Sequence, residues 1–575
     1  MKKKKILTRP VPAIDHTLPA DLHPILTRVY LARGVRAREE LDLSLKRLPG
    51  PGTLRGIDTM ASRLTEAIER QKRILVVADY DADGATACAL AVSGLRALGA
   101  AQVGFIVPDR FRHGYGLSPS LVEAALPQRP EVLLTVDNGI ASLAGVEAAK
   151  AAGLEVLITD HHLPGDCLPA VDAIVNPNVA GDAFPSKAIA GVGVMFYVLS
   201  ALRARLRETG WFEKTGLVVP NLGELLDLVA LGTVADVVPL DRVNRILVEQ
   251  GLKRIRSGHG RPGIQALAEV AGRRLRDLVA SDLGFSLAPR LNAAGRLEDM
   301  ALGIRCLLAD SADEARVLAL KLDALNRERR EIEGQMQAEA MSYLHSGRWE
   351  GADEAGVCLF EPGWHEGVIG ILASRIKDRL GRPVIAFAET DDGRLKGSAR
   401  SIPGLHIRDV LSAIEVSRPG LMERYGGHAM AAGLTLRRRD YEAFSGLFSE
   451  KVAEFLDEGG MDPVISTDGE LEARDFSLAL AEELRRGGPW GQGFPQPTFH
   501  GEFTVLKSRI VGERHLKMAL RSPAGHALDA IAFSLDDPAA WLSCSRLRLA
   551  FQLEVNEYRE RRSVQLKVDY MEVLQ

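Results

Sequence analysis

Three short apolar runs near the start of the chain share one pattern, and each of them ends in aspartate. They occupy residues 73–79, 131–137 and 154–160 and consist mainly of Val, Ile and Leu. Apolar runs of this length that are followed by turn residues are typical of buried β-strands. Ala-rich segments with helical spacing, such as residues 86–98, separate them. Strands that alternate with helices predict a parallel sheet, and therefore a fold of the α/β class.

The middle and the end of the chain follow other patterns. Residues 221–310 are mostly helical, and residues 313–346 have the charged, amphipathic spacing of one long connecting helix. A second α/β unit is predicted at about 355–456, where apolar strand patterns flank a helical one. Beyond the Gly- and Pro-rich loop 487–497 polar and apolar positions alternate, which predicts a small antiparallel β-barrel.

The alternation along the predicted barrel strands also predicts where the aromatic side chains lie. Residues at every second position of a strand face the same side of the sheet. We therefore expect most of the following aromatic residues to lie in the core of the barrel: Phe503, Phe533, Phe551 and Tyr558.

The length of the chain requires several folding units, because 575 residues exceed what one hydrophobic core supports. The patterns above divide the chain into five segments. These are an N-terminal segment (1–50), the parallel-sheet domain (51–220), a helical segment with the long connecting helix (221–346), the second α/β domain (347–458) and the barrel (459–575).

Composition places the protein among globular proteins and leaves its activity open. Hydrophobic residues make up 46% of the chain and charged residues 26%, and no segment resembles a membrane span. The basic first residues pass into Pro and Asp without the apolar stretch of a secretory signal, so we expect a cytoplasmic location. The net charge of -4 is not the basic surplus that is typical of nucleic-acid-binding proteins.

The five cysteines limit the chemistry of any metal site. They lie far apart, are odd in number and form no Cys-X-X-Cys pair. This spacing supports neither a disulfide framework nor a thiolate zinc site. We therefore expect a bound metal to have oxygen and nitrogen ligands.

Acidic and histidine side chains follow each of the three predicted strands. They are Asp79, Asp81, Asp83, Asp137, Asp160, His161 and His162. The carboxyl ends of parallel strands line the ligand crevice, so we expect these side chains to converge. So many carboxylates repel one another unless cations neutralise them, and carboxylate with imidazole suits Mn²⁺ or Mg²⁺. Asp236 is a further candidate, because it lies in an apolar stretch where an unpaired acid is costly to bury.

Each of these motifs taken alone also has a structural interpretation. The acidic cluster at 79–83 fits a solvated turn with a helix-capping Asp, and the His pair fits hydrogen bonding in the core. The segment 191–193 is Gly-Val-Gly, lacks the complete dinucleotide-binding pattern and is interpreted as packing. The coincidence of three strand ends favours the metal site.

The order and spacing of the motifs resemble a known family. DYDADG, VDNG, TDHH and GTVADVVPL are similar to motifs of the DHH phosphoesterase superfamily. PRLNAAGRL, KGSARS, YGGHAMAAGL and GPWGQGFPQP resemble the RecJ family within it, so the resemblance covers essentially the whole chain. It implies a DHH catalytic domain at 51–220, a DHH-associated substrate-binding domain at 347–458 and an OB-like single-strand-binding domain at 459–575.

The resemblance also implies roles for particular residues. The metal ligands for a pair of Mn²⁺ or Mg²⁺ ions would be Asp79, Asp81, Asp83, Asp137, His161 and Asp236, of which all but Asp79 are named as catalytic. Asp137 would bridge the two ions, while Asp160 and His162 orient ligands by hydrogen bonds. The implied 5′-phosphate and DNA-binding residues are Arg110, Arg290, Asn292, Arg296, Ser398, Arg400 and His428.

The activity implied by the resemblance is 5′→3′ hydrolysis of single-stranded DNA to 5′ mononucleotides, in recombination and repair. The implied partners are single-stranded DNA, a single-strand-binding protein and repair helicases, with a monomeric enzyme and no membrane. Two alternatives stay open. A phosphodiesterase for short oligonucleotides or small nucleotides would differ in substrate length, and a non-catalytic DNA-binding scaffold would have lost the metal ligands that are intact here.

Overall fold

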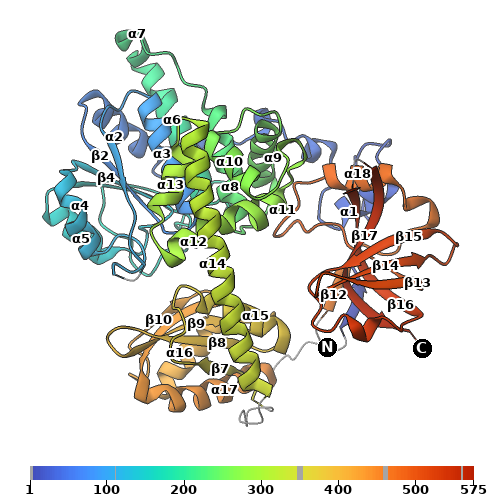
Figure 1. Ribbon diagram of the computed structural model, residues 1–575. Helices are drawn as coiled ribbons and strands as arrows, with labels where there is room; N and C mark the ends of the chain where they lie inside the picture. The colour runs from blue at the N-terminus through green and yellow to red at the C-terminus, as the bar shows by residue number, and fades with distance from the viewer. Residues whose placement is uncertain (1–3, 111, 346–353, 458–463, 559–560, 575) are drawn as a thin grey trace. The chain divides into compact units, whose positions relative to one another are not determined.

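A five-stranded parallel sheet organises the first third of the chain (Figure 1). Its strand order is β3-β2-β4-β5-β6, and every neighbouring pair is parallel. The strands are β2 (Ile74–Ala78), β3 (Val103–Ile106), β4 (Val132–Val136), β5 (Glu155–Thr159) and β6 (Ala173–Val175). The three predicted strands are confirmed as the central β2, β4 and β5, which are buried over nearly their whole length and so require continuous apolar runs. The two edge strands are shorter or partly exposed and gave no comparable pattern.

Helices cover both faces of this sheet. On one face, α6 (Gly191–Glu208) packs with both α2 (Ile57–Glu69) and α3 (Ala82–Ala97). On the other, α4 (Pro119–Ala125) and α5 (Leu143–Ala151) share a core with the central strands. Helix α3 begins at Ala82, earlier than the predicted start at residue 86, because the Asp81 side chain caps it by accepting hydrogen bonds from the second and third residues that follow.

The helical region that follows packs against α3. Helix α8 (Leu226–Ala235) lies along α3, and α9 (Arg242–Arg256) lies along α8. The close approach depends on Gly232, where a Cβ would lie 2.1 Å from Thr86 Oγ1. The region continues with α10 (Pro262–Val270), α11 (Ala280–Asp282), a π-helical turn (Leu283–Leu287), α12 (Ala288–Leu297) and α13 (Ala301–Leu308).

The predicted long helix and second α/β domain are confirmed. Helix α14 (Ala312–His345) leads into a mixed sheet of order β10-β11-β9-β8-β7, in which only β7 and β8 are parallel. The strands are β7 (Val357–Phe360), β8 (Val384–Glu389), β9 (Arg394–Arg400), β10 (Arg424–Gly427) and β11 (Ala431–Arg437). The helices are α15 (Ile369–Leu380), α16 (Ile407–Ser417) and α17 (Tyr441–Asp457), and α16 and α17 share the core of this domain with the sheet.

The C-terminal strands form a closed barrel of order β13-β14-β15-β17-β16. They are β13 (Phe499–Val511), β14 (His515–Arg521), β15 (Ala527–Ala532), β16 (Arg546–Tyr558) and β17 (Arg561–Val573). The barrel is not wholly antiparallel as predicted, because β15 and β17 pair in parallel. Phe503 and Phe551 are buried, as expected of most of the four aromatic residues, whereas Phe533 follows β15, is 49% exposed and lies outside the core. The side chain of Tyr558 lies outside the described residues.

The N-terminal segment is bound to the start of the barrel domain. Tyr30, at the end of α1 (Pro24–Leu31), stacks against Trp490 and Phe494 with ring centroids 6.0 and 6.4 Å apart. Arg33 forms a buried ion pair with Asp468, in which Nη1 and Oδ1 are 2.7 Å apart. Residues from opposite ends of the chain therefore form one structural unit.

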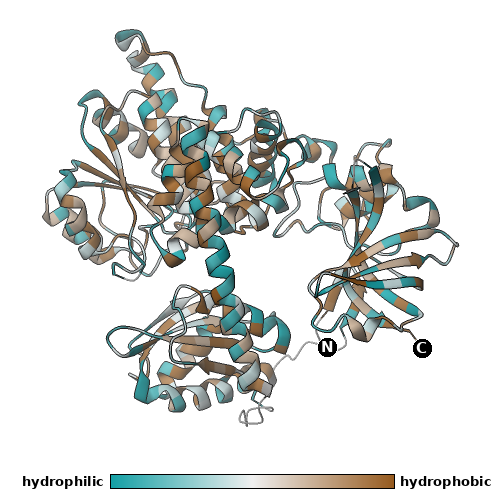
Figure 2. Ribbon diagram, in the orientation of Figure 1, coloured by the Kyte–Doolittle hydropathy of each residue, from teal (hydrophilic) through white to brown (hydrophobic). Residues whose placement is uncertain are grey.

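The chain divides into two compact units, Met1–Lys5 with Ala324–Ile465 and Ile6–Asp323 with Ser466–Gln575. The computed structural model describes residues 4–110, 112–345, 354–457, 464–558 and 561–574. The predicted boundaries at 346–347 and 458–459 lie outside these ranges. Figure 2 shows apolar residues along the strands of both sheets. Across the described ranges, no helix combines the length and apolar character that crossing a bilayer requires.

Candidate metal centre

The acidic and histidine residues at the strand ends converge as predicted. Three groups of side chains each offer ligand atoms that all lie within 4.8 Å of one another. The groups are Asp79 with Asp81 and Asp137, Asp83 with His161 and Asp236, and Asp137 with His161 and His162. Since Asp137 and His161 each belong to two groups, the groups adjoin. Adjacent ligand sets that share a carboxylate are the arrangement that a pair of cations requires.

His161 lies between the carboxylates of two of these groups. Its Nε2 atom is 3.1 Å from Asp137 Oδ1 and 3.4 Å from Asp236 Oδ2. Both of these oxygens are buried and accept no hydrogen bond from any residue that the structure describes. Buried acceptors normally have a partner, so a cation fits the space between them. Carboxylate oxygens with one imidazole nitrogen suit Mn²⁺ or Mg²⁺.

The N-terminus of α6 contributes to the site in a way that the sequence did not reveal. Asp83 accepts hydrogen bonds from the backbone N–H groups of Gly191 and Val192, at 2.7 and 3.0 Å. A Cβ at Gly191 would lie 2.5 Å from Asp137 Oδ1, so only glycine allows this approach. The interpretation of this segment as packing was therefore incomplete. Gly191 packs against one acidic residue of the site and donates to another.

Two residues at the site have backbone conformations that L-amino acids rarely adopt. Asp137 has a φ of 63°, and Val237, directly after Asp236, has a φ of 62°. The left-handed region is especially costly for a β-branched residue such as valine. Strained conformations of this kind persist where the surrounding structure imposes them, and they cluster at functional sites.

Asp160 connects the histidines to the sheet. Its Oδ2 accepts from the N–H of Ile140 at 2.9 Å. Its Oδ1 accepts from the backbone N–H groups of His161 and His162 and lies 2.7 Å from Nδ1 of His162. Both oxygens are thus used in hydrogen bonds that orient the histidines. This geometry suits the supporting role that the resemblance implies for Asp160.

Burial and mutual repulsion determine the protonation of the cluster. Burial, and then the neighbouring carboxylates, raise the pKa of Asp79, Asp83 and Asp137 well above its usual range. The same causes raise the pKa of Asp236 to about 7. Burial alone would lower the pKa of His162, but its bond to Asp160 raises that pKa to about 9. Cation binding at this cluster therefore displaces protons.

Arg110 lies over an aromatic ring beside the candidate metal ligands. Its guanidinium carbon is 4.1 Å from the ring centroid of Tyr80, and its Nε is buried without a hydrogen-bond partner among the described residues. Tyr115 meets Tyr80 edge-on at 6.0 Å and His162 at 5.9 Å. These two tyrosines line the site and were not predicted, because single aromatic residues in a loop carry no distinguishing pattern.

The predicted DNA-binding residues of α12 contact other parts of the same unit. Arg290 is only 8% exposed, and its Nε and Nη2 lie 2.9 and 2.8 Å from Asp323 Oδ1. Asn292 Oδ1 accepts from the N–H of Ala82 at 2.8 Å, which positions the loop that carries Asp81 and Asp83. Arg296, also on α12, is half-buried. Their binding of DNA stays a prediction.

The remaining predicted DNA-binding residues belong to the other unit. Arg400 Nη1, at the end of β9, donates to Ser398 Oγ at 3.1 Å and to the Ala399 carbonyl at 2.8 Å. Burial lowers the pKa of Arg400, and within the described ranges no carboxylate pairs with it. His428 is exposed in the loop between β10 and β11. That Arg110 and Arg400 bind the same phosphate stays a prediction, because the two residues belong to different compact units.

Family models match three regions of the chain. The DHH family N-terminal domain matches residues 73–233, the DHHA1 domain residues 353–458 and the RecJ OB domain residues 467–570. The predicted domain types are therefore confirmed, while the exact segment boundaries stay predictions.

Curated proteins and solved structures are similar over nearly the whole chain. The single-stranded-DNA-specific exonuclease RecJ of Dickeya dadantii is 52% identical over 97% of this chain and 98% of its own length. Its Escherichia coli counterpart is 51% identical over 97% of both chains. The crystal structure of Thermus thermophilus RecJ in complex with Mn²⁺ has a TM-score of 0.78 at 32% identity, covering 96% of this chain and 76% of that one. This chain belongs to the RecJ family of single-stranded-DNA-specific exonucleases.

Proposed function

We propose that this chain hydrolyses single-stranded DNA from the 5′ end to 5′ mononucleotides with two divalent cations. The observation that carries the proposal is the cluster of metal ligands, with two buried carboxylate oxygens that lack hydrogen bonds. Its occurrence in a chain about half identical to exonucleases specific for single-stranded DNA supports this substrate.

The ligand cluster has the composition that two cations need. Mn²⁺ or Mg²⁺ would be held by Asp79, Asp81, Asp83, Asp137, His161 and Asp236, with Asp137 between the two positions. Such cations lower the pKa of a bound water and neutralise charge on the scissile phosphate. The chain itself keeps the ligands in place: Asp160 orients the histidines, and the N-terminus of α6 holds Asp83. No side-chain nucleophile is needed.

Cationic side chains suit a terminal phosphate. Arg110 has a buried Nε without a hydrogen bond in the described chain, and Arg400 has no carboxylate partner there. A guanidinium binds phosphate through two parallel hydrogen bonds, so these residues, with Ser398, would hold the 5′ end. A pocket that holds the 5′ end sets the direction of digestion. Arg290, Asn292, Arg296 and His428 complete the predicted DNA-binding set.

The barrel would bind the strand beyond the site. Small barrels of this class bind single strands through basic grooves and stacking aromatics. We further infer that the enzyme is a cytoplasmic monomer that acts with a single-strand-binding protein and repair helicases. These partners would supply the single strands that the enzyme digests.

End-labelled single-stranded DNA tests the proposed direction. With Mn²⁺, a strand labelled at its 5′ end is expected to release labelled mononucleotide at once, while a 3′ label is released last. A blocked 5′ end should slow digestion strongly, and a blocked 3′ end should not. Early release of the 3′ label would contradict the proposal. A clear preference for tetranucleotides over long strands would favour the short-oligonucleotide alternative.

Mn²⁺ affinity is expected to rise as the pH rises from about 5 to about 7. In the folded, metal-free protein the pKa of Asp236 is about 7, whereas in the unfolded chain it is near the ordinary value of 3.8. Asp236 therefore keeps its proton to a higher pH in the folded protein. Cations therefore compete with this proton, and the apparent affinity falls by up to about tenfold per pH unit below 7 for each proton displaced. Folding of the metal-free protein should correspondingly lose stability as pH rises from about 4 to 7.

Binding isotherms of Mn²⁺ at several pH values between 5 and 8 measure this effect. The Asp236→Asn variant, which carries no such proton, should bind Mn²⁺ more weakly and with less pH dependence. An affinity that does not change across this range would refute the proposed proton displacement.

A further inference from the structure

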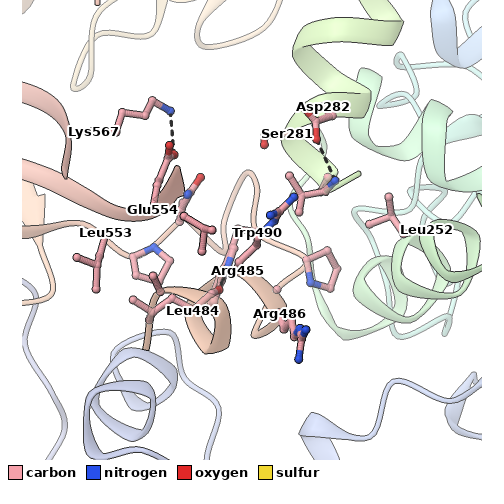
Figure 3. A pocket seen from close by; sticks show the side chains of 18 of the residues that line it. Leu252, Ser281, Asp282, Leu484, Arg485, Arg486, Trp490, Leu553, Glu554 and Lys567 are labelled. Atoms are coloured by element: carbon pink, nitrogen blue, oxygen red, sulfur yellow. Dashed lines mark hydrogen bonds and ion pairs between the residues drawn. The ribbon is translucent and has the colours of Figure 1, made fainter. Parts of the chain in front are cut away.

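A cavity of about 410 Å³ lies where the helical region faces the barrel domain (Figure 3). Its wall comes from α9, the α11 turn, α18 (Leu478–Arg486) with the loop that follows, and strands β16 and β17. None of the metal ligands or predicted DNA-binding residues lines it. The cavity is thus separate from the candidate metal centre, although both belong to the same compact unit.

Two arginines on this wall are held side by side. Arg256 Nε donates to the carbonyl of Leu278 at 2.7 Å, and Arg485 Nη2 donates to the carbonyl of Asp277, the preceding residue. Arg256 belongs to α9 and Arg485 to α18. Hydrogen bonds to two neighbouring carbonyl groups therefore fix both guanidinium groups. A guanidinium has five N–H groups, so each retains donors for a ligand.

The charge of these arginines is not balanced. Glu249 is the carboxylate nearest to Arg256, at 3.7 Å, and it also lies 3.5 Å from Lys253. Arg485 forms no ion pair with any described residue. Burial lowers the pKa of Arg256, the charges of Glu249 and Asp282 raise it, and the nearby charge of Arg485 lowers it. An anion between the two guanidinium groups would relieve this repulsion.

Other charges on the wall are already paired. Lys567 lies 3.5 Å from Glu554, as Figure 3 shows. Arg273 lies 3.2 Å from Asp282. Much of the remaining wall is apolar and includes Pro489, Pro497, Leu553 and the half-exposed ring of Phe533. A ligand that fits this lining would carry an anionic group for the arginines and an apolar group for the prolines, Leu553 and Phe533.

We propose that this cavity binds one phosphate-bearing nucleotide, with its phosphate at Arg256 and Arg485 and its base or sugar against the apolar wall. The source of the nucleotide rests on the proposed function. It is either one unit of a bound single strand or the free mononucleotide that hydrolysis releases. Either source makes the cavity a second nucleotide site, distinct from the site of cleavage.

Binding in EDTA tests the proposal without hydrolysis. The full chain is titrated with long labelled oligothymidylate, with a tetranucleotide and with thymidine monophosphate, at several salt concentrations. In Arg485→Gln, binding at the cavity should weaken several-fold, and the slope of log affinity against log salt should fall by about 1. Glu249→Gln removes the carboxylate that competes for Arg256 and should strengthen binding. Arg474→Gln, whose side chain is 79% exposed and outside the cavity, is the charge-matched control.

The ligands distinguish the two sources. Weaker binding of the long strand alone in Arg485→Gln assigns the cavity to the strand, and loss of monophosphate binding assigns it to the free nucleotide. Unchanged binding of all three ligands overturns the proposal. The proposal is also overturned if Glu249→Gln weakens binding as much as Arg485→Gln does. Equal weakening after removal of a negative and of a positive charge would indicate a structural defect, which does not depend on the sign of the charge removed. If the proposed function is wrong, the protein will not hydrolyse single-stranded DNA in the presence of Mn²⁺. That result is independent of the binding measured in EDTA.

Discussion

Replacing Asp137 with asparagine is expected to lower the rate of DNA hydrolysis by at least about a thousandfold, because Asp137 is the carboxylate shared by two ligand groups. Asparagine retains the volume of the side chain and tolerates the φ of 63° at this position. The loss would therefore report the missing charge and not a distorted backbone. The measurement is the release of mononucleotides from single-stranded DNA with saturating Mn²⁺.

Thermal unfolding in EDTA separates this effect from misfolding. Metal-free Asp137→Asn should be at least as stable as the parent, since it removes a buried acid whose pKa burial and neighbouring carboxylates raise. The matched control is Asp58→Asn, which neutralises an exposed carboxylate on α2 of the same unit and should leave activity unchanged. Full activity in Asp137→Asn would remove the basis of the two-cation proposal.

Replacing Asp468 with asparagine is expected to destabilise the protein by about 3–5 kcal/mol, the usual cost of leaving one member of a buried ion pair without its partner. Arg33 and Asp468 have side chains only 1% and 0% exposed, and their N–O distance is 2.7 Å. Arg9 reaches the same carboxylate at 3.2 Å. Urea denaturation followed by tryptophan fluorescence measures the change, because Trp490 lies beside Arg33.

An exposed pair with similar geometry provides the control. Asp42 and Arg47 are 2.8 Å apart, but their side chains are 42% and 45% exposed. Water solvates both charges there, so Asp42→Asn should change the urea midpoint little. Equal stability of Asp468→Asn and the parent would show that the N-terminal segment does not anchor the barrel domain through this pair.

The central strands and the convergence of the acidic residues could be predicted from the sequence because their signals are local. A strand buried on both faces needs a continuous apolar run, and β2 and β4 have one. Acids placed directly after such strands must lie at the same edge of a parallel sheet, so the convergence of Asp79 and Asp137 followed from chain order. Burial on both faces did not constrain the sequence of the edge strands β3 and β6. It did not constrain the exposed ring of Phe533 either.

Contacts between distant segments were decided only by the tertiary structure. The amides of α6 that hold Asp83, and the pairing of Arg290 with Asp323, depend on which helices pack together. The attachment of the N-terminal segment to the barrel joins residues more than 400 positions apart.

The sequence by itself determined which residue types stand at the ends of the buried strands, because periodicity and chain order depend on neighbouring positions alone. The tertiary structure decided which partners those residues meet. A hydrogen-bond or ion-pair partner is chosen by packing, and packing at close range depends on features such as Gly191 and Gly232, whose missing side chains admit Asp137 and Thr86. That dependence on long-range contacts is why the cavity at Arg256 and Arg485 had no signature in the sequence.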